Sequence, residues 1–195
     1  MQESTERSSK RIFAARRPSA FGGCRRWRGS SNWRVTDVQR LLDALIAAGV
    51  EFAVVGGVAL VLRGSSRVTL DLDLCYARHR ENLHKLAAAL APFHPRLRGA
   101  PPDLPFLWDD QTLASGLNFT LSTDLGDIDI LGEISGVGDY ATVAAGSSPL
   151  TVGATRVLVK DLDALERAKR AAGRAKDLLD LAEIAEIRRR SAKPA

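Results

Sequence analysis

The sequence contains little cysteine and little histidine. Its two cysteines, Cys24 and Cys75, have no paired spacing, which excludes a disulfide framework and a zinc knuckle and favours a reducing compartment. The three histidines, His79, His84 and His94, have no spacing that converges on a metal, so no role is assigned to them.

Long hydrophobic runs are also absent. The segment VEFAVVGGVALVLRG is broken by glycines and is shorter than the roughly 18 residues that a membrane-spanning helix needs. The N-terminus is basic but lacks the continuous apolar segment of a secretory signal. We therefore expect a cytoplasmic protein with no membrane partner.

Positive charge is unevenly distributed along the chain. The net charge is +5, but residues 1–34 hold nine Lys or Arg against two Glu, so the rest of the chain is slightly acidic. The overall charge is therefore no argument that the core binds nucleic acid. We interpret residues 1–34 as a basic, disordered extension. The alternative is that Trp27 and Trp33 of this extension stack on bases.

Hydrophobic periodicity predicts one α+β domain over residues 35–195. Its first helix begins near Thr36, where Thr36 and Gln39 have capping-box spacing, and ends at Gly49. The other predicted elements are strands at 52–55, 68–74, 117–122 and 127–131, a hairpin turn at 124–126, a hairpin at 151–159, and helices at 58–63, 80–90, 162–171 and 175–189. The proline-rich stretch 91–116 has no readable pattern. This order of elements favours a mixed sheet with flanking helices.

Four aspartates form two Asp-X-Asp pairs in predicted strands. Because side chains alternate between the faces of a strand, Asp71 and Asp73 project to one side, roughly 6.5 to 7 Å apart. Asp127 and Asp129 share a face in the same way. If the two strands are neighbours, three or four acids converge, which is unfavourable unless a cation neutralises them. Oxygen ligands alone select Mg²⁺ or Mn²⁺. The alternative is a solvated strand face.

Gly56 and Gly57 separate a predicted strand from a predicted helix. Glycines at such a place let backbone amides approach phosphate oxygens closely, and a helix N-terminus favours negative charge. A glycine pair alone most often indicates only a turn. Here 13 residues separate it from the first Asp-X-Asp strand. The combination predicts a phosphate-binding turn beside metal-binding acids, and so the binding of a nucleoside triphosphate (NTP).

The segment GGVALVLRGSSRVTLDLDL, preceded by an apolar strand, resembles the nucleotidyltransferase superfamily, which has a polymerase-β-like fold. Within it, the sequence is most similar to AbiEii-like toxins of type IV toxin–antitoxin systems, including mycobacterial toxins that modify tRNA. The later segment DLDALERAKRAAGRAKDLLDL supports this placement, since that family carries a lysine, then Gly-Arg, then Asp-X-X-Asp on its C-terminal helices. The resemblance spans about Phe52 to Leu181 and implies that helices at 161–190 complete the site.

The resemblance implies roles for the acids of the two strands. Asp71 and Asp73 would bind metal, and Asp129 would be the third carboxylate, as metal ligand or base, with Asp127 as the alternative. In related toxins the hydroxyl residue two positions before the first aspartate can be phosphorylated by the antitoxin, which implies regulation at Thr69. A phosphate there would repel nucleotide and compete for metal.

The resemblance also implies roles for residues outside those strands. Lys169 would contact the triphosphate, and Asp177 and Asp180 would complete the site. Arg67, just before the first Asp-X-Asp strand, either binds phosphate or pairs with an acid. The basic residues of the C-terminal helices have a second reading, as an ordinary charged helix face with intrahelical partners.

The implied activity is transfer of a nucleoside monophosphate from an NTP to the 3′ end of tRNA, with Mg²⁺ or Mn²⁺ as cofactor. Such an enzyme would be a toxin that blocks translation and growth, with a cognate, kinase-like antitoxin protein as partner. Two alternatives remain. One is a nucleotidyltransferase that acts on a small molecule, such as an antibiotic, or on a protein hydroxyl. The other is a non-catalytic binding or antitoxin relative.

Overall fold

The computed structural model describes residues 35–101 and 103–192. The predicted extension 1–34, with its two tryptophans, lies outside the described residues. Among the helices that the structure describes, none is long and apolar enough to cross a membrane.

A mixed sheet forms the centre of the domain. Within the described residues it has seven strands, in the order β3-β4-β5-β2-β1-β9-β8. β2 is parallel to β5 and β1 to β9, whereas the other neighbours are antiparallel. These strands are β1 (Phe52–Val55), β2 (Asp71–Tyr76), β3 (Arg96–Leu97), β4 (Asn118–Thr123), β5 (Gly126–Leu131), β8 (Ser147–Val152) and β9 (Thr155–Lys160). A separate small sheet pairs β6 (Glu133–Ile134) with β7 (Gly138–Asp139).

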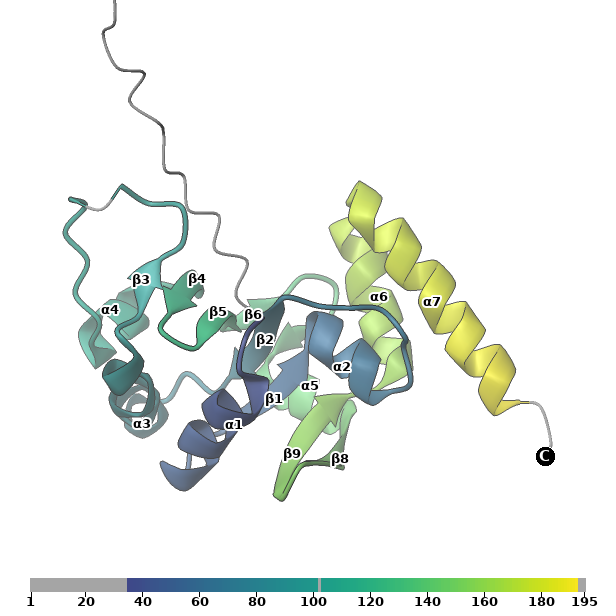
Figure 1. Cartoon of the computed structure of the whole chain (residues 1–195), viewed down its shortest axis with the longest axis horizontal. Helices are drawn as coiled ribbons and strands as arrows, with labels where there is room; N and C mark the ends of the chain where they lie inside the picture. The colour runs from purple at the N-terminus through teal and green to yellow at the C-terminus, as the bar shows by residue number, and fades with distance from the viewer. Residues whose placement is uncertain (1–34, 102, 193–195) are drawn as a thin grey trace, which may run out of the picture. The chain divides into compact units, whose positions relative to one another are not determined.

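Helices cover both faces of this sheet, which confirms the predicted α+β class. They are α1 (Val38–Ala47), α2 (Gly56–Leu62), α3 (Arg80–Leu90), α4 (Asp110–Ser115), α5 (Tyr140–Ala145), α6 (Leu162–Ala172) and α7 (Ala175–Ser191), with a 3₁₀ turn η1 (Ala91–Phe93). The main core joins the sheet to α1, α2, α3 and α4 and includes one buried residue each of α6 and α7, and a smaller cluster joins β1 and β2 to α5. Figure 1 shows α6 and α7, in yellow-green and yellow, side by side next to α2.

Alternation along β2 and β5 places apolar and acidic residues on opposite faces. Leu72, Leu74, Ile128 and Ile130 are at most 1% exposed and belong to the main core. The aspartates between them therefore face the other side of the sheet. Burying these four side chains anchors the two strands, and each contributes roughly 1.5–3 kcal/mol. The core thus fixes the face on which the acids lie.

The start of the domain differs from the predicted capping box. The N-cap of α1 is Asp37, whose carboxylate accepts from the Arg40 amide at 3.1 Å, so the prediction of Thr36 as cap is wrong. The Thr36 hydroxyl instead donates to the Leu70 carbonyl at 2.6 Å and accepts from the Asp127 amide at 2.9 Å. Thr36 therefore ties the segment before α1 to the ends of β2 and β5.

Three other local predictions need correction. The strand predicted over 68–74 begins only at Asp71, because Val68 is 83% exposed and has no core to face. Gly56 and Gly57 are the first residues of α2, not a turn before it. The stretch 91–116 contains η1, β3 and α4, held by pairing of β3 with β4 and by the Asp109 N-cap, which are contacts without a periodic pattern. β6, β7 and α5 were not predicted at all.

Candidate active site

Two parallel strands bring the aspartate pairs together. In the register of β2 and β5, Asp71 lies beside Asp127 and Asp73 beside Asp129. Carboxylate oxygens of Asp71, Asp73 and Asp129 lie within 4.8 Å of one another. The Asp127 carboxylate is outside this group and accepts a hydrogen bond from the Ser122 hydroxyl at 2.7 Å. The structure therefore groups Asp129, rather than Asp127, with the first pair.

Burial and crowding raise the pKa values of two of these acids, Asp73 and Asp129. Burial, together with repulsion from Asp71 and Asp129, raises the pKa of Asp73 to about 6. Burial also raises the pKa of Asp129, although the nearby Arg98 guanidinium opposes this rise. Burial therefore disfavours the ionised forms of Asp73 and Asp129. Their oxygen-only donor set fits a hard divalent cation such as Mg²⁺ or Mn²⁺.

Gly56 and Gly57 allow α2 to lie directly against the acids. Gly56 has φ +59°, and a Cβ added to it would lie 1.9 Å from an oxygen of Asp73. A Cβ on Gly57 would lie 2.4 Å from the Thr69 hydroxyl. The Gly57 amide donates to the Asp73 carboxylate at 3.3 Å. In this structure the glycine pair thus positions the Asp73 carboxylate. The contact of these glycines with phosphate stays a prediction.

An ion-pair network across α6 and α7 holds the predicted lysine. The Lys169 ammonium lies 2.7 Å from an oxygen of Asp180 and 3.4 Å from one of Asp177. The Arg174 guanidinium also binds Asp177, at 2.8 and 3.1 Å. Hydrogen bonds from Arg174 lower the pKa of Asp177 to about 2. Arg67 pairs with Asp180, so the structure places it on an acid beside the lysine.

A cavity of about 540 Å³ joins the acids to this network. Its volume is within the range of roughly 300–1,000 Å³ that is usual for small-molecule sites. Both glycines, Arg67, Thr69, Lys169, Asp180 and the three grouped aspartates line it, whereas Asp127 and Asp177 do not. Another part of its wall is apolar and comes from Val55, Leu131, Ile134, Leu165, Ala168 and Ala172. The cavity therefore combines anionic, cationic and apolar surfaces.

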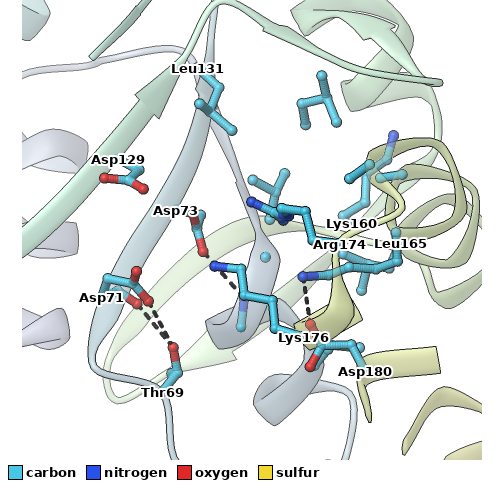
Figure 2. Close-up of a pocket in the computed structure, with 18 of the residues that line it drawn as sticks. Thr69, Asp71, Asp73, Asp129, Leu131, Lys160, Leu165, Arg174, Lys176 and Asp180 are labelled. Carbon is cyan, nitrogen blue, oxygen red and sulfur yellow. Dashed lines mark hydrogen bonds and ion pairs between the residues drawn. The ribbon is translucent and has the colours of Figure 1, made fainter. Parts of the chain in front are cut away.

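Lys176 is a cation of this cavity for which the sequence left two readings. It lines the cavity, and Figure 2 shows its side chain extending from α7 toward Asp71 and Asp73. Arg170, by contrast, pairs with Glu166 one turn away on α6, at 2.6 Å, and is 66% exposed. The charged-face reading therefore describes Arg170 but not Lys176.

Among solved structures, the chain is similar to a proposed nucleotidyltransferase (TM1012) of Thermotoga maritima. The TM-score is 0.50 and the sequence identity 15%, over 76% of this chain and 89% of that chain. The chain has a nucleotidyltransferase fold. A second structure, ANT(2″)-Ia in complex with adenylyl-2″-tobramycin, matches 80% of this chain and 97% of that chain at 15% identity, with a TM-score of 0.43. No protein-family model matches the sequence. No curated protein matches it either.

The sequence did not predict Arg98, which lies in the middle of the acids of this nucleotidyltransferase fold. Its guanidinium is 2.7 Å from an oxygen of Asp129, 3.1 Å from one of Asp127 and 4.0 Å from one of Asp71. Arg98 belongs to the stretch 91–116, where no periodicity predicts structure, and pairing of the two-residue strand β3 with β4 sets its place. No signal in the sequence identifies it.

Thr69 lies beside the first aspartate. Its hydroxyl is 3.1 Å from a carboxylate oxygen of Asp71 and 3.3 Å from the carbonyl of the same residue. It also lines the cavity. A group attached to this hydroxyl would therefore be next to the predicted metal ligands.

Proposed function

We propose that the protein is a divalent-metal-dependent nucleotidyltransferase. The observation that carries this proposal is the grouping of Asp71, Asp73 and Asp129, from adjacent parallel strands, in one cavity with Lys169. Three clustered carboxylates suit one or two divalent cations, and a lysine close by suits the phosphates that such cations bind. The nucleotidyltransferase fold supports the same reading.

Each of these residues has a distinct part in the proposed transfer. Asp71, Asp73 and Asp129 would hold Mg²⁺ or Mn²⁺, which neutralises phosphate charge and orients the triphosphate when bound. Lys169 would donate to phosphate oxygens. The acceptor oxygen forms a bond to the α-phosphorus, and the bond from that phosphorus to the β-bridging oxygen breaks, so pyrophosphate leaves. The hydroxyl proton passes to a carboxylate oxygen of Asp129, which would act as the base.

The proposed acceptor is the 3′ end of tRNA, and the proposed role is that of a cytoplasmic toxin that blocks translation. The support for both is the resemblance of the Gly-Gly to Asp-X-Asp segment, and of the segment from Lys169 to Asp180, to AbiEii-like toxins. The same resemblance supports a cognate antitoxin as partner.

A labelled-nucleotide experiment tests the proposed function. The full chain is incubated with each α-³²P-labelled NTP, Mg²⁺ and total tRNA, and products are separated by size and by nuclease digestion. We expect label at the 3′ end of tRNA, and its loss with EDTA or in an Asp71→Asn variant. An Asp103→Asn variant, which changes an exposed loop aspartate, serves as the matched control.

The products distinguish the proposed acceptor from the alternatives. Label that resists nuclease and remains with a small molecule or with protein would show that tRNA is not the acceptor, whereas the transfer reaction itself would stand. Absence of transfer from all four NTPs to any acceptor, by correctly folded protein, would leave only a non-catalytic role.

We further propose that phosphorylation of Thr69 switches the enzyme off. A phosphate would add about −1.5 to −2 charge beside Asp71, where it would repel the triphosphate. A Thr69→Glu variant is expected to transfer label at least tenfold more slowly than Thr69→Val, which removes the hydroxyl at similar volume. Initial rates at saturating Mg²⁺ measure the difference. Equal rates in the two variants would exclude regulation by charge at this position.

A further inference from the structure

Arg98 reaches the acids from the far side of β4. Its backbone amide donates to the Thr120 carbonyl of β4 at 2.9 Å, just after β3 ends. Thr120 and Ser122 of β4 pair with Asp129 and Asp127 of β5. The guanidinium contacts acids of both β5 and β2, so its side chain crosses β4 to reach them. The short strand β3 therefore places Arg98 where its guanidinium can neutralise the carboxylates of β5 and β2.

The guanidinium and a divalent cation would share one carboxylate. Arg98 donates to Asp129 at 2.7 Å, and Asp129 belongs to the group of three that fits a metal. Arginine does not lose its proton in proteins, so it cannot give way by becoming neutral. Two cations on one half-buried carboxylate repel each other strongly at such distances. The two cations would therefore compete for the negative charge of Asp129.

Asp127 offers the guanidinium a second position without a large movement. It already lies 3.1 Å from Arg98, is 40% exposed, and is outside the group that fits the metal. Its other oxygen is held by the Ser122 hydroxyl, which fixes the carboxylate in place. Asp127 can therefore have a role other than metal binding, which is to hold the Arg98 guanidinium.

We infer that Arg98, which pairs with both Asp129 and Asp127 in the absence of metal, gives up Asp129 and keeps Asp127 when a divalent cation binds. Arg98 and Asp127 are then positioning residues. Arg98 competes with the metal for Asp129, and Asp127 holds the guanidinium that Asp129 has released. This inference rests on the proposed metal-dependent function. The pairing of Arg98 with both acids neutralises the site without metal, and the contact with Asp127 lets Arg98 release Asp129 when metal is present.

Binding of Mn²⁺ alone to the full chain tests the inference without any turnover. The loss of the free-ion signal in electron paramagnetic resonance gives the dissociation constant in the absence of nucleotide. A hydrogen bond between charged groups changes an affinity by roughly tenfold or more. We therefore expect Arg98→Gln to bind Mn²⁺ about tenfold more tightly than the unmodified chain. Arg96→Gln, which removes a 71% exposed arginine nearby, should leave the affinity unchanged.

An Asp127→Asn variant examines the same exchange from the other side. It should weaken Mn²⁺ binding several-fold, because Arg98 then has only Asp129 to pair with closely. Removing any nearby acid also weakens cation binding directly, so the change is repeated in the Arg98→Gln background. The inference requires the Asp127→Asn effect to be at least threefold smaller in that background. Equal effects in the two backgrounds, or Arg98→Gln binding no tighter than the unmodified chain, would overturn it.

The unmodified chain and Asp71→Asn separate this inference from the proposed function. If neither binds Mn²⁺, or both bind it equally, the proposed metal site itself is wrong. If the unmodified chain binds Mn²⁺ and Asp71→Asn does not, the metal site stands, and the Arg98 variants alone decide the inference.

Discussion

An Asp73→Asn variant is expected to lose nucleotidyl transfer and, without metal, to gain stability at neutral pH. Loss of a metal ligand removes several kcal/mol of transition-state stabilisation, which is a loss of roughly a thousandfold or more in rate. The gain in stability has a separate cause. Asp73 has a pKa raised to about 6 by burial and by its acidic neighbours, so folding opposes its ionisation. Asparagine keeps the shape and still accepts the hydrogen bond from the Gly57 amide.

The sign of the pH dependence follows from the raised pKa. The folded chain holds the Asp73 proton more tightly than the unfolded chain, whose value is near 3.8. Stability from this group is therefore complete below about pH 4 and is lost as pH rises through about 6. The loss amounts to at most about 3 kcal/mol, since each pKa unit is worth about 1.4 kcal/mol. Asparagine does not titrate, so the variant avoids that loss.

Urea denaturation in EDTA at several pH values measures this effect. The free energies of unfolding of the variant and the unmodified chain should agree near pH 4 and diverge by up to about 3 kcal/mol by pH 7–8. Added Mg²⁺ or Mn²⁺ should narrow the gap, because it stabilises only the unmodified site. Asp103→Asn should change neither stability nor transfer. A variant that is less stable than the unmodified chain at pH 8, or that retains full transfer, contradicts the assignment of Asp73.

The parts of the site that the sequence predicts are those set by local pattern. Alternation in Asp71-Leu-Asp73 and in Asp127-Ile-Asp129 gives the shared face, because one side of each strand must join the core. The pairing of β2 with β5 is not a local property, so the sequence predicts that the acids converge only if these two strands are neighbours. Once the strands pair in register, three carboxylates meet.

Long-range contacts decide the features that the sequence did not predict. Thr36 has the spacing of a helix cap, but its hydroxyl binds Leu70, 34 residues away, and the neighbouring Asp37 caps α1 instead. Arg98 lies in a stretch without periodicity, and only its contacts with β5 make it part of the site. Lys176 has the same appearance as Arg170 in a charged helix, and only the packing of α7 separates them. Tertiary contacts of this kind override local propensity.

An Asp177→Ala variant is expected to be the most damaging single change in the network of α6 and α7. Asp177 is only 1% exposed, accepts from the backbone and side chain of Arg174, and lies 3.4 Å from the Lys169 ammonium. Its removal leaves a nearly buried lysine with one fewer carboxylate, and it leaves the Arg174 amide at the N-terminus of α7 without the carboxylate that accepts its hydrogen bond. Breaking a buried ion pair costs about 3–5 kcal/mol. We expect a loss of about 3 kcal/mol in the free energy of unfolding, because Asp180 still pairs with Lys169.

Asp163→Ala is the matched control, since Asp163 also joins α6 to α7, through Arg188 at 2.5 Å, but is 80% exposed. Exposed pairs contribute at most about 1 kcal/mol.

Because the pKa of Asp177 is lowered to about 2, the contribution of Asp177 to stability is present above about pH 4 and is lost as pH falls toward 2. The stability gap between Asp177→Ala and the unmodified chain should therefore narrow over that interval, whereas the gap for Asp163→Ala should stay small throughout. Urea denaturation across this pH range measures both. Equal costs for the two variants at pH 7 would mean that the network holding Lys169 is an exposed surface feature, and the placement of that lysine beside the proposed triphosphate site would lose its structural support.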